Sequence, residues 1–154
     1  MNRRIFLKGT LAGSAMAAAV GAGLVTPSRV VAAWPEDAML SESVEDGLNS
    51  LFGDSSMQES GDVEITAPDI AENGAVVPIT VETGMDNVEA VSIIVDGAGS
   101  PMAGHYELGS KAHPMVSTRI KMGETADVIG VVRANGTNYM ARREVKVTVG
   151  GCGG

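Results

Sequence analysis

The amino-acid sequence predicts a mainly β protein: an immunoglobulin-like antiparallel β-sandwich, preceded by a short N-terminal helix and followed by a flexible C-terminal Gly-Gly-Cys-Gly-Gly arm. Three observations support this prediction. From residue 62 onward, apolar and polar residues alternate in about seven short segments, the strand count of such a sandwich. Upstream of them lies a segment with the spacing of an amphipathic helix. The last five residues are four glycines around one cysteine.

The predicted helix covers Glu36–Phe52. Four apolar residues recur at helical spacing along it, with acids at other positions: Leu40, Val44, Leu48 and Leu51. Gly53 then predicts the end of the helix, because glycine readily adopts the left-handed conformation found there. The polar segment Ser55–Gly61 reads as a loop. We therefore assign residues 34–61 to an N-terminal helix and linker, and residues 62–149 to the β-sandwich domain.

The strands are predicted from alternation with a period of two residues. They cover Val63–Thr66, Ala75–Thr83, Val88–Val95, a short segment near His105–Leu108, Val116–Met122, Thr125–Ala134 and Tyr139–Val149. Pro78 predicts an edge position for its strand, because proline donates no ladder hydrogen bond. Asn135-Gly136 predicts a tight hairpin turn, since both residues tolerate positive φ. Arg142-Arg143 interrupts the alternation and predicts a β-bulge.

The segment Thr125–Ala134 is apolar on both of its predicted faces. The residues that break the alternation are Val128, Ile129, Val131 and Val132. A strand with one face in water should alternate between apolar and polar residues. Two interpretations stay open: the segment is the central strand of the sandwich, or it lies against a partner protein.

Residues 1–33 predict an export signal. A basic start precedes the weakly apolar segment Gly9–Val25 and the small residues Val31-Ala32-Ala33, which is the layout of a secretory signal. The segment Asn2–Lys8 contains an arginine pair and looks like a twin-arginine motif. An uncleaved membrane anchor is the alternative, although glycines interrupt the apolar run. We expect export to the periplasm by the twin-arginine route, cleavage near Trp34 and no membrane association afterwards.

Charge is distributed unevenly along the chain. Residues 1–33 contain four bases and no acid, so the remainder carries seven bases against nineteen acids, a net charge of −12. A body this acidic repels nucleic acid and anionic membrane surfaces. We therefore expect no nucleic-acid partner.

The chemistry is expected at Cys152, the single cysteine of the chain. The glycines around it are Gly150, Gly151, Gly153 and Gly154. Because glycine loses the most conformational entropy when it is ordered, residues 150–154 predict a flexible arm that carries the thiol about 10 Å beyond Val149. A thiol forms reversible covalent bonds with sulfur compounds. No cation lies near it in the sequence, so we expect the pKa of Cys152 at or above the ordinary cysteine value.

Other interpretations of the tail stay open. Cys152 can link two copies of the chain through an intermolecular disulfide, a state that can coexist with a thiol that carries bound sulfur compounds. A periplasmic thiol redox protein or sensor acting through Cys152 is a second function, weakened by the lack of a resolving cysteine. In a third interpretation, the domain is structural and the tail has no role.

Catalytic, metal and cofactor sites are not predicted. His105 and His113 are the two side chains with near-neutral basicity, and no motif surrounds either of them. Together with Met102 and Met115 they raise the possibility of a copper site, but Cys152 lacks the nearby histidine that a cupredoxin-like site requires. We expect no catalytic residue, no metal and no cofactor, and hence no enzyme.

These features resemble the SoxY family of sulfur carriers in periplasmic thiosulfate oxidation. The resemblance rests on the terminal Gly150–Gly154 motif, the lead-in Glu144–Val149, the segment Pro114–Lys121 and the export signal. It implies a sandwich domain that pairs with a SoxZ-type subunit as a heterodimer. It also implies that Cys152 is the covalent attachment site, which receives thiosulfate through a haem-containing transferase. The bound sulfur is then presented to a sulfate-releasing hydrolase and a sulfane dehydrogenase.

Overall fold

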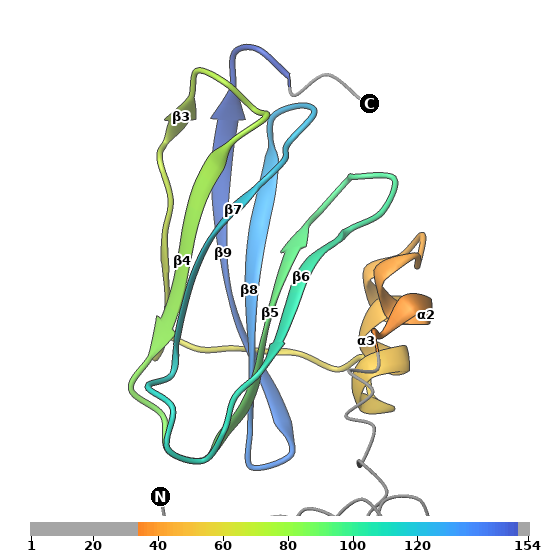
Figure 1. Cartoon of the computed structure of the whole chain (residues 1–154), viewed down its shortest axis with the longest axis vertical. Coiled ribbons are helices and arrows are strands. Elements are labelled where there is room, and N and C mark those ends of the chain that lie inside the picture. The colour runs from red at the N-terminus through yellow and green to blue at the C-terminus, as the bar shows by residue number, and fades with distance from the viewer. Residues whose placement is uncertain (1–33, 151–154) are drawn as a thin grey trace, which may run out of the picture. The chain divides into compact units, whose positions relative to one another are not determined.

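The computed structural model describes residues 34–150. In order along the chain, its elements are α2 (Glu36–Met39), α3 (Val44–Phe52), β1 (Gln58–Glu59), β2 (Val63–Thr66), β3 (Ile70–Ala71), β4 (Val77–Thr83), β5 (Val88–Val95), β6 (Met102–Glu107), β7 (Met115–Ile120), β8 (Ala126–Ala134) and β9 (Thr137–Val147). The predicted fold class is confirmed: the domain is a mainly β, immunoglobulin-like sandwich with short helical segments at its start (Figure 1).

Two sheets face each other across the core. The larger sheet has the order β1-β9-β8-β5-β6, with β3 also paired to β9, and the smaller sheet has the order β2-β4-β7. Strands β1 and β3 pair with β9 in parallel, over two residues each, whereas the other pairs are antiparallel. The sequence did not predict these two short strands, because two residues are too few to show an alternating pattern.

The core between the sheets is aliphatic. Its fully buried members come from alternate positions of β4, β5 and β8, and include Val77, Ile79, Val81, Val91, Ile93, Val128 and Val132. Alternate side chains of a strand point to one face, so each strand contributes every second residue to this layer. Burial of these aliphatic side chains, at about 25 cal/mol per Å² of apolar surface, is the main force that holds the sheets together.

The predicted single helix over Glu36–Phe52 is wrong in one respect: it is broken into α2 and α3. Ser43 is extended rather than helical, and its Oγ accepts a hydrogen bond from the Asp46 backbone N–H (3.1 Å), which caps α3. Leu40, in the break, is exposed. The predicted helix stop is confirmed, since Gly53 has φ of 68° in the left-handed region.

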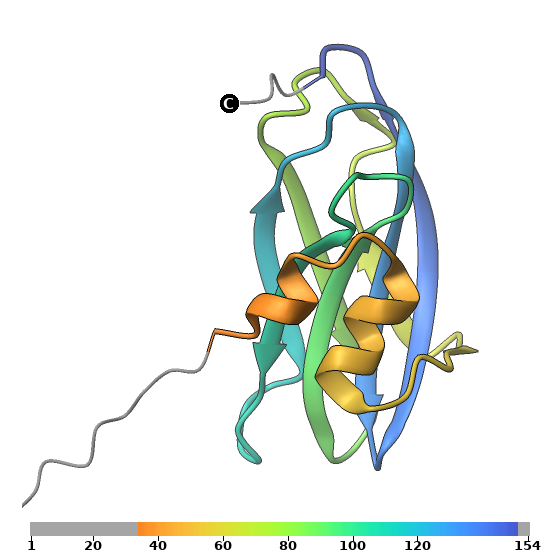
Figure 2. The ribbon, with the colours of Figure 1, turned by 90° about the vertical axis from the view of Figure 1, so that its right-hand side faces the viewer.

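The two apolar faces of β8 are both explained within the domain. The strand lies between β5 and β9, and Val128 and Val132 face the smaller sheet. Ile129 and Val131 instead pack with Leu48 of α3 in a second apolar cluster. Figure 2 shows the helices lying across this face of the larger sheet. The central-strand interpretation is confirmed, so this strand gives no support for a partner surface.

The predicted edge position of Pro78 is wrong, because β4 lies between β2 and β7. Pro78 is nevertheless accommodated locally. Strand β2 ends where Thr66 pairs with Thr80, so it does not extend alongside Pro78. A missing N–H therefore leaves no gap in that ladder.

The predicted bulge at Arg142-Arg143 is also wrong, since β9 pairs with β8 in continuous register. Both arginines stay in a regular strand because each has a carboxylate partner. Arg142 bridges Asp96 (2.9 Å) and Asp127 (3.2 Å), and Arg143 pairs with Asp69 (2.8 Å). The register shifts occur instead in β5, one near its start and one between Ile93 and Ile94.

The Asn135-Gly136 turn between β8 and β9 is confirmed. Asn135 has φ of 51° and Gly136 has φ of 75°, the two positive values of a type I′ hairpin turn. Within the part of the chain that the structure describes, no helix is long and apolar enough to cross a membrane.

Candidate functional site at the end of strand β9

The predicted attachment residue lies outside the described residues, together with Gly151, Gly153 and Gly154. Gly150 is described and lies at the exit of β9. The described part of the site is the arm root, defined as residues Thr148–Gly150, together with the loops that contact it. These loops are residues 72–76, before β4, and residues 121–125, between β7 and β8.

One side of the arm root continues the pairing of β9 with β3. The Thr148 N–H donates to the Ala71 carbonyl (3.1 Å), and the Thr148 hydroxyl donates to the Glu72 carbonyl (3.2 Å). One step further, the Gly74 N–H donates to the Val149 carbonyl (2.8 Å). Backbone hydrogen bonds therefore hold the chain up to the last residue before the glycines.

The loop between β7 and β8 holds the other side of the arm root. The Thr125 hydroxyl accepts a hydrogen bond from the Val147 N–H (3.0 Å), and the Met122 N–H donates to the Gly74 carbonyl (2.7 Å). Gly150 approaches Gly123 so closely that a Cβ built on Gly150 would overlap the Gly123 carbonyl oxygen. The first glycine of the motif is thus required for a close backbone approach, a role that the sequence did not reveal.

The arm root presents a mixed surface. Val149 and Val76 are exposed apolar side chains, at 62% and 53% of their full accessibility. Exposed charges of both signs stand in the adjoining segments, on Glu72, Lys121 and Glu124. The contacts of the arm root hold the chain in place up to Gly150, two residues before Cys152 in the sequence.

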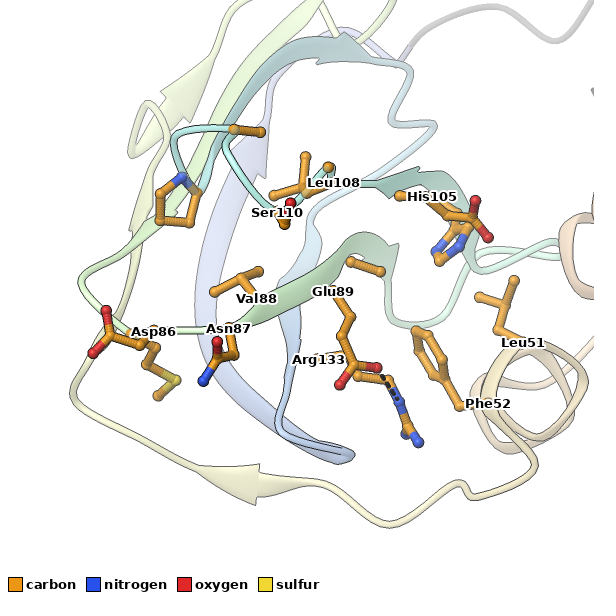
Figure 3. Close-up of a pocket in the computed structure, with 16 residues that line it drawn as sticks. Leu51, Phe52, Asp86, Asn87, Val88, Glu89, His105, Leu108, Ser110 and Arg133 are labelled. Atoms are coloured by element: carbon orange, nitrogen blue, oxygen red, sulfur yellow. Dashed lines mark ion pairs between the residues drawn. The ribbon is translucent and has the colours of Figure 1, made fainter.

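The near-neutral base predicted at His105 belongs to a different part of the domain. A cavity of about 760 Å³ lies between the β4–β5 and β6–β7 loops and the end of α3 (Figure 3). These two loops are at the end of the sandwich opposite the end of β9 (Figure 1). His105 lines it, with Nδ1 2.9 Å from the Ser92 hydroxyl and its ring 5.6 Å from that of Phe52, edge to face. Burial lowers the pKa of His105. The structure does not bring this residue to the arm root.

The four residues considered for copper do not share one face. Met102 is 4% exposed and packs in the cluster beneath α3, whereas Met115 is exposed on β7 of the other sheet. His113 lies in the loop before β7.

Arg133, which the sequence analysis did not single out, lies near His105 in the cavity. Its guanidinium stacks over the Phe52 ring at 4.8 Å and pairs with the Glu89 carboxylate at 3.6 Å.

Comparisons with known proteins agree with the resemblance seen in the sequence. A family model described as sulfur oxidation protein SoxY matches residues 48–152. A solved structure of the sulfur carrier protein SoxY from Chlorobium limicola f thiosulfatophilum is 41% identical, with a TM-score of 0.61. The match covers 68% of this chain and 94% of that one. A search of the curated proteins found no match.

A second solved structure, superoxide reductase (neelaredoxin) from Ignicoccus hospitalis, shares 18% identity over 55% of this chain and 78% of that one, with a TM-score of 0.50. At this identity the likeness concerns the fold alone. The family match, in contrast, starts in α3, runs through both sheets and the arm root, and ends at Cys152. This chain therefore belongs to the SoxY family of sulfur oxidation proteins.

Proposed function

We propose that this protein is a sulfur carrier of thiosulfate oxidation and that its intermediates are bound covalently to Cys152. The observation that carries the proposal is the extent of the family match, which includes Cys152, the single cysteine of the chain. The similar protein from Chlorobium limicola is itself described as a sulfur carrier. The arm root adds support, because it holds the chain firmly two residues before the thiol.

The proposed chemistry uses the thiol as an attachment point. The Cys152 sulfur forms a sulfur–sulfur bond with the terminal sulfur of thiosulfate. The thiol proton is released, and a haem-containing transferase accepts the electron pair. A hydrolase then adds water to the sulfonate end, which releases sulfate and leaves a persulfide on Cys152. A sulfane dehydrogenase acts on the remaining sulfur. In this scheme the carrier has no turnover of its own.

Mass spectrometry of the protein from cells grown on thiosulfate tests this function. We expect sulfur–oxygen adducts on the C-terminal peptide, and none on a Cys152→Ser variant prepared in the same way. A wild-type protein without adducts under these conditions would contradict the carrier role. Thiol–disulfide exchange activity in their place would favour the redox alternative.

A SoxZ-type subunit is the proposed stable partner, in a heterodimer. Size-exclusion chromatography of the protein alone and after co-expression with that subunit tests it, with co-elution as the expected result. A monomer whose elution does not change would count against the partner. Electrophoresis without reductant, on wild type and Cys152→Ser, reports whether a Cys152-linked dimer also forms.

A further inference from the structure

Strand β7 forms an open edge of the sandwich. It pairs with β4 on one side, and no further strand of the described residues pairs with it on the other. Figure 2 shows it along one border of the sheets. In the larger sheet, β9 carries β1 and β3, and β6 lies against α2, near which the Ser100 hydroxyl donates to the Met39 carbonyl (2.7 Å). The opposite edge of the smaller sheet is β2, which has four residues and contacts β8 and β9 of the larger sheet. An open edge is a template for one more strand.

The backbone groups that face this open edge follow from the ladder to β4. The Thr83 N–H donates to the Pro114 carbonyl (3.1 Å), so Pro114 marks a position whose backbone points toward β4. Positions that bond to the partner alternate with positions that point away in an antiparallel pair. The N–H and C=O of Ser117 and Arg119 therefore point away from β4, where an added strand would bond.

The edge is also basic, in a protein that is otherwise strongly acidic. Residues 108–123 contain Lys111, Arg119 and Lys121 and no Asp or Glu. Within the described residues, these bases form no ion pair, and Arg119 and Lys121 are exposed. The other bases of the domain all have carboxylate partners: Arg133, Arg142, Arg143 and Lys146. The unpaired positive charge of the domain is thus concentrated on β7, at Arg119, and in the segments on either side of it, at Lys111 and Lys121.

From this geometry we infer that β7 is a docking edge for a protein partner that adds an extended, acidic strand beside it. Carboxylates of the partner would pair with Arg119 and Lys121, while its backbone bonds to Ser117 and Arg119. The rest of the surface carries excess negative charge and repels an acidic partner, so attraction is confined to this edge and sets the orientation of docking. A second copy of this chain fits poorly, because pairing β7 with β7 would bring two basic strands together. The inference does not depend on the sulfur-carrier role.

Hydrogen exchange with a defined probe tests the inference. The probe is a short synthetic peptide that alternates glutamate and valine, and the control peptide has lysine in place of glutamate. With saturating acidic peptide, we expect exchange of the Ser117 and Arg119 amides to slow by about tenfold or more. The lysine peptide should leave both rates unchanged.

Matched variants separate charge from general effects. Combined Arg119→Glu and Lys121→Glu should weaken binding of the acidic peptide by about tenfold or more, whereas Lys146→Glu, an exposed base on β9, should not. Ser117→Pro removes an outward N–H without touching the bonds to β4, and should weaken binding while the thermal midpoint shows that the fold persists.

Several results would overturn the inference. They are no slowing at Ser117 and Arg119, slowing confined to another edge, or equal slowing with the lysine peptide. If the Arg119→Glu and Lys121→Glu variant binds the acidic peptide as well as the wild type does, these bases do not recognise a partner. They would then serve to prevent β7 from pairing with β7 of another copy. Slowing that appears without peptide as protein concentration rises would identify a second copy as the occupant.

Discussion

At the scale of single residues, close backbone contact explains the first glycine of the terminal motif. Gly150 leaves no room for a Cβ beside the Gly123 carbonyl, and it directly follows residues that are hydrogen-bonded to Ala71, Glu72 and Gly74. A side chain at this position must therefore displace either the β7–β8 loop or the end of β9.

The variant Gly150→Ala tests this explanation. We expect the end of β9 to fray, so that the amides of Gly74 and Thr148 exchange about tenfold faster with solvent. Gly109→Ala is the matched control, because a Cβ there meets open space. Unchanged exchange rates in Gly150→Ala, measured by hydrogen exchange, would show that the contact with Gly123 does not hold the arm root.

His105 makes the stability of the domain depend on pH. Its pKa is lowered first by burial, with a smaller opposing effect of Glu107. The unfolded chain therefore takes up a proton on His105 at a higher pH than the folded chain does. Stability is complete above the ordinary histidine range and falls as pH drops through that range toward the lowered pKa.

The variant His105→Gln should weaken this loss of stability on acidification, whereas His113→Gln should retain it. Urea unfolding at a series of pH values measures the effect. The prediction fails if wild type and His105→Gln lose stability in parallel as the pH falls.

At the scale of elements, the smaller sheet carries a mismatched pair. Glu64 of β2 stands directly opposite Glu82 of β4, and like charges in this position destabilise an antiparallel pair. Two residues along β4, Thr80 stands opposite Thr66 of β2, and its hydroxyl donates to the Ser117 hydroxyl of β7 (2.9 Å). The outer face of this sheet is therefore not fully optimised for stability.

Replacing Glu64 by Gln should raise the free energy of unfolding by roughly 0.2–1 kcal/mol. The gain should shrink as salt is added, because ions screen exposed charges. Glu124→Gln, in a loop, removes the same charge without a facing carboxylate and serves as the control. Equal effects of the two variants in urea unfolding would assign the gain to net charge alone.

At the scale of the whole molecule, the first 33 residues and the rest of the chain carry opposite net charge. Residues 1–33 contain four bases and no acid, whereas the remainder has a net charge of −12. We propose that the arginine pair directs export to the periplasm by the twin-arginine route, since the apolar segment behind it is weak and interrupted by glycine.

Changing both Arg3 and Arg4 to Lys keeps the charge and should leave the protein in the cytoplasm. Fractionation of cells that produce the wild type and this variant measures the outcome. Normal periplasmic accumulation of the double variant would contradict the proposed route.

The sequence by itself determined the fold class, most strand positions, the hairpin at Asn135-Gly136 and the family. Alternation and turn chemistry are local signals, and they are strong where strands are long and half buried. The family was recognisable because the Gly150–Gly154 motif and the segment Pro114–Lys121 are each a continuous run of residues, which can be read directly from the sequence. The sequence alone also identifies Cys152 as the single thiol of the chain.

Only the tertiary structure decided which strands neighbour one another. It placed Pro78 on a central strand, kept Arg142 and Arg143 in regular pairing through distant carboxylates, and buried both faces of β8, one beneath α3. It also brought Gly123 against Gly150 and left β7 open. Each of these depends on contacts between residues far apart in the chain, which local periodicity does not encode.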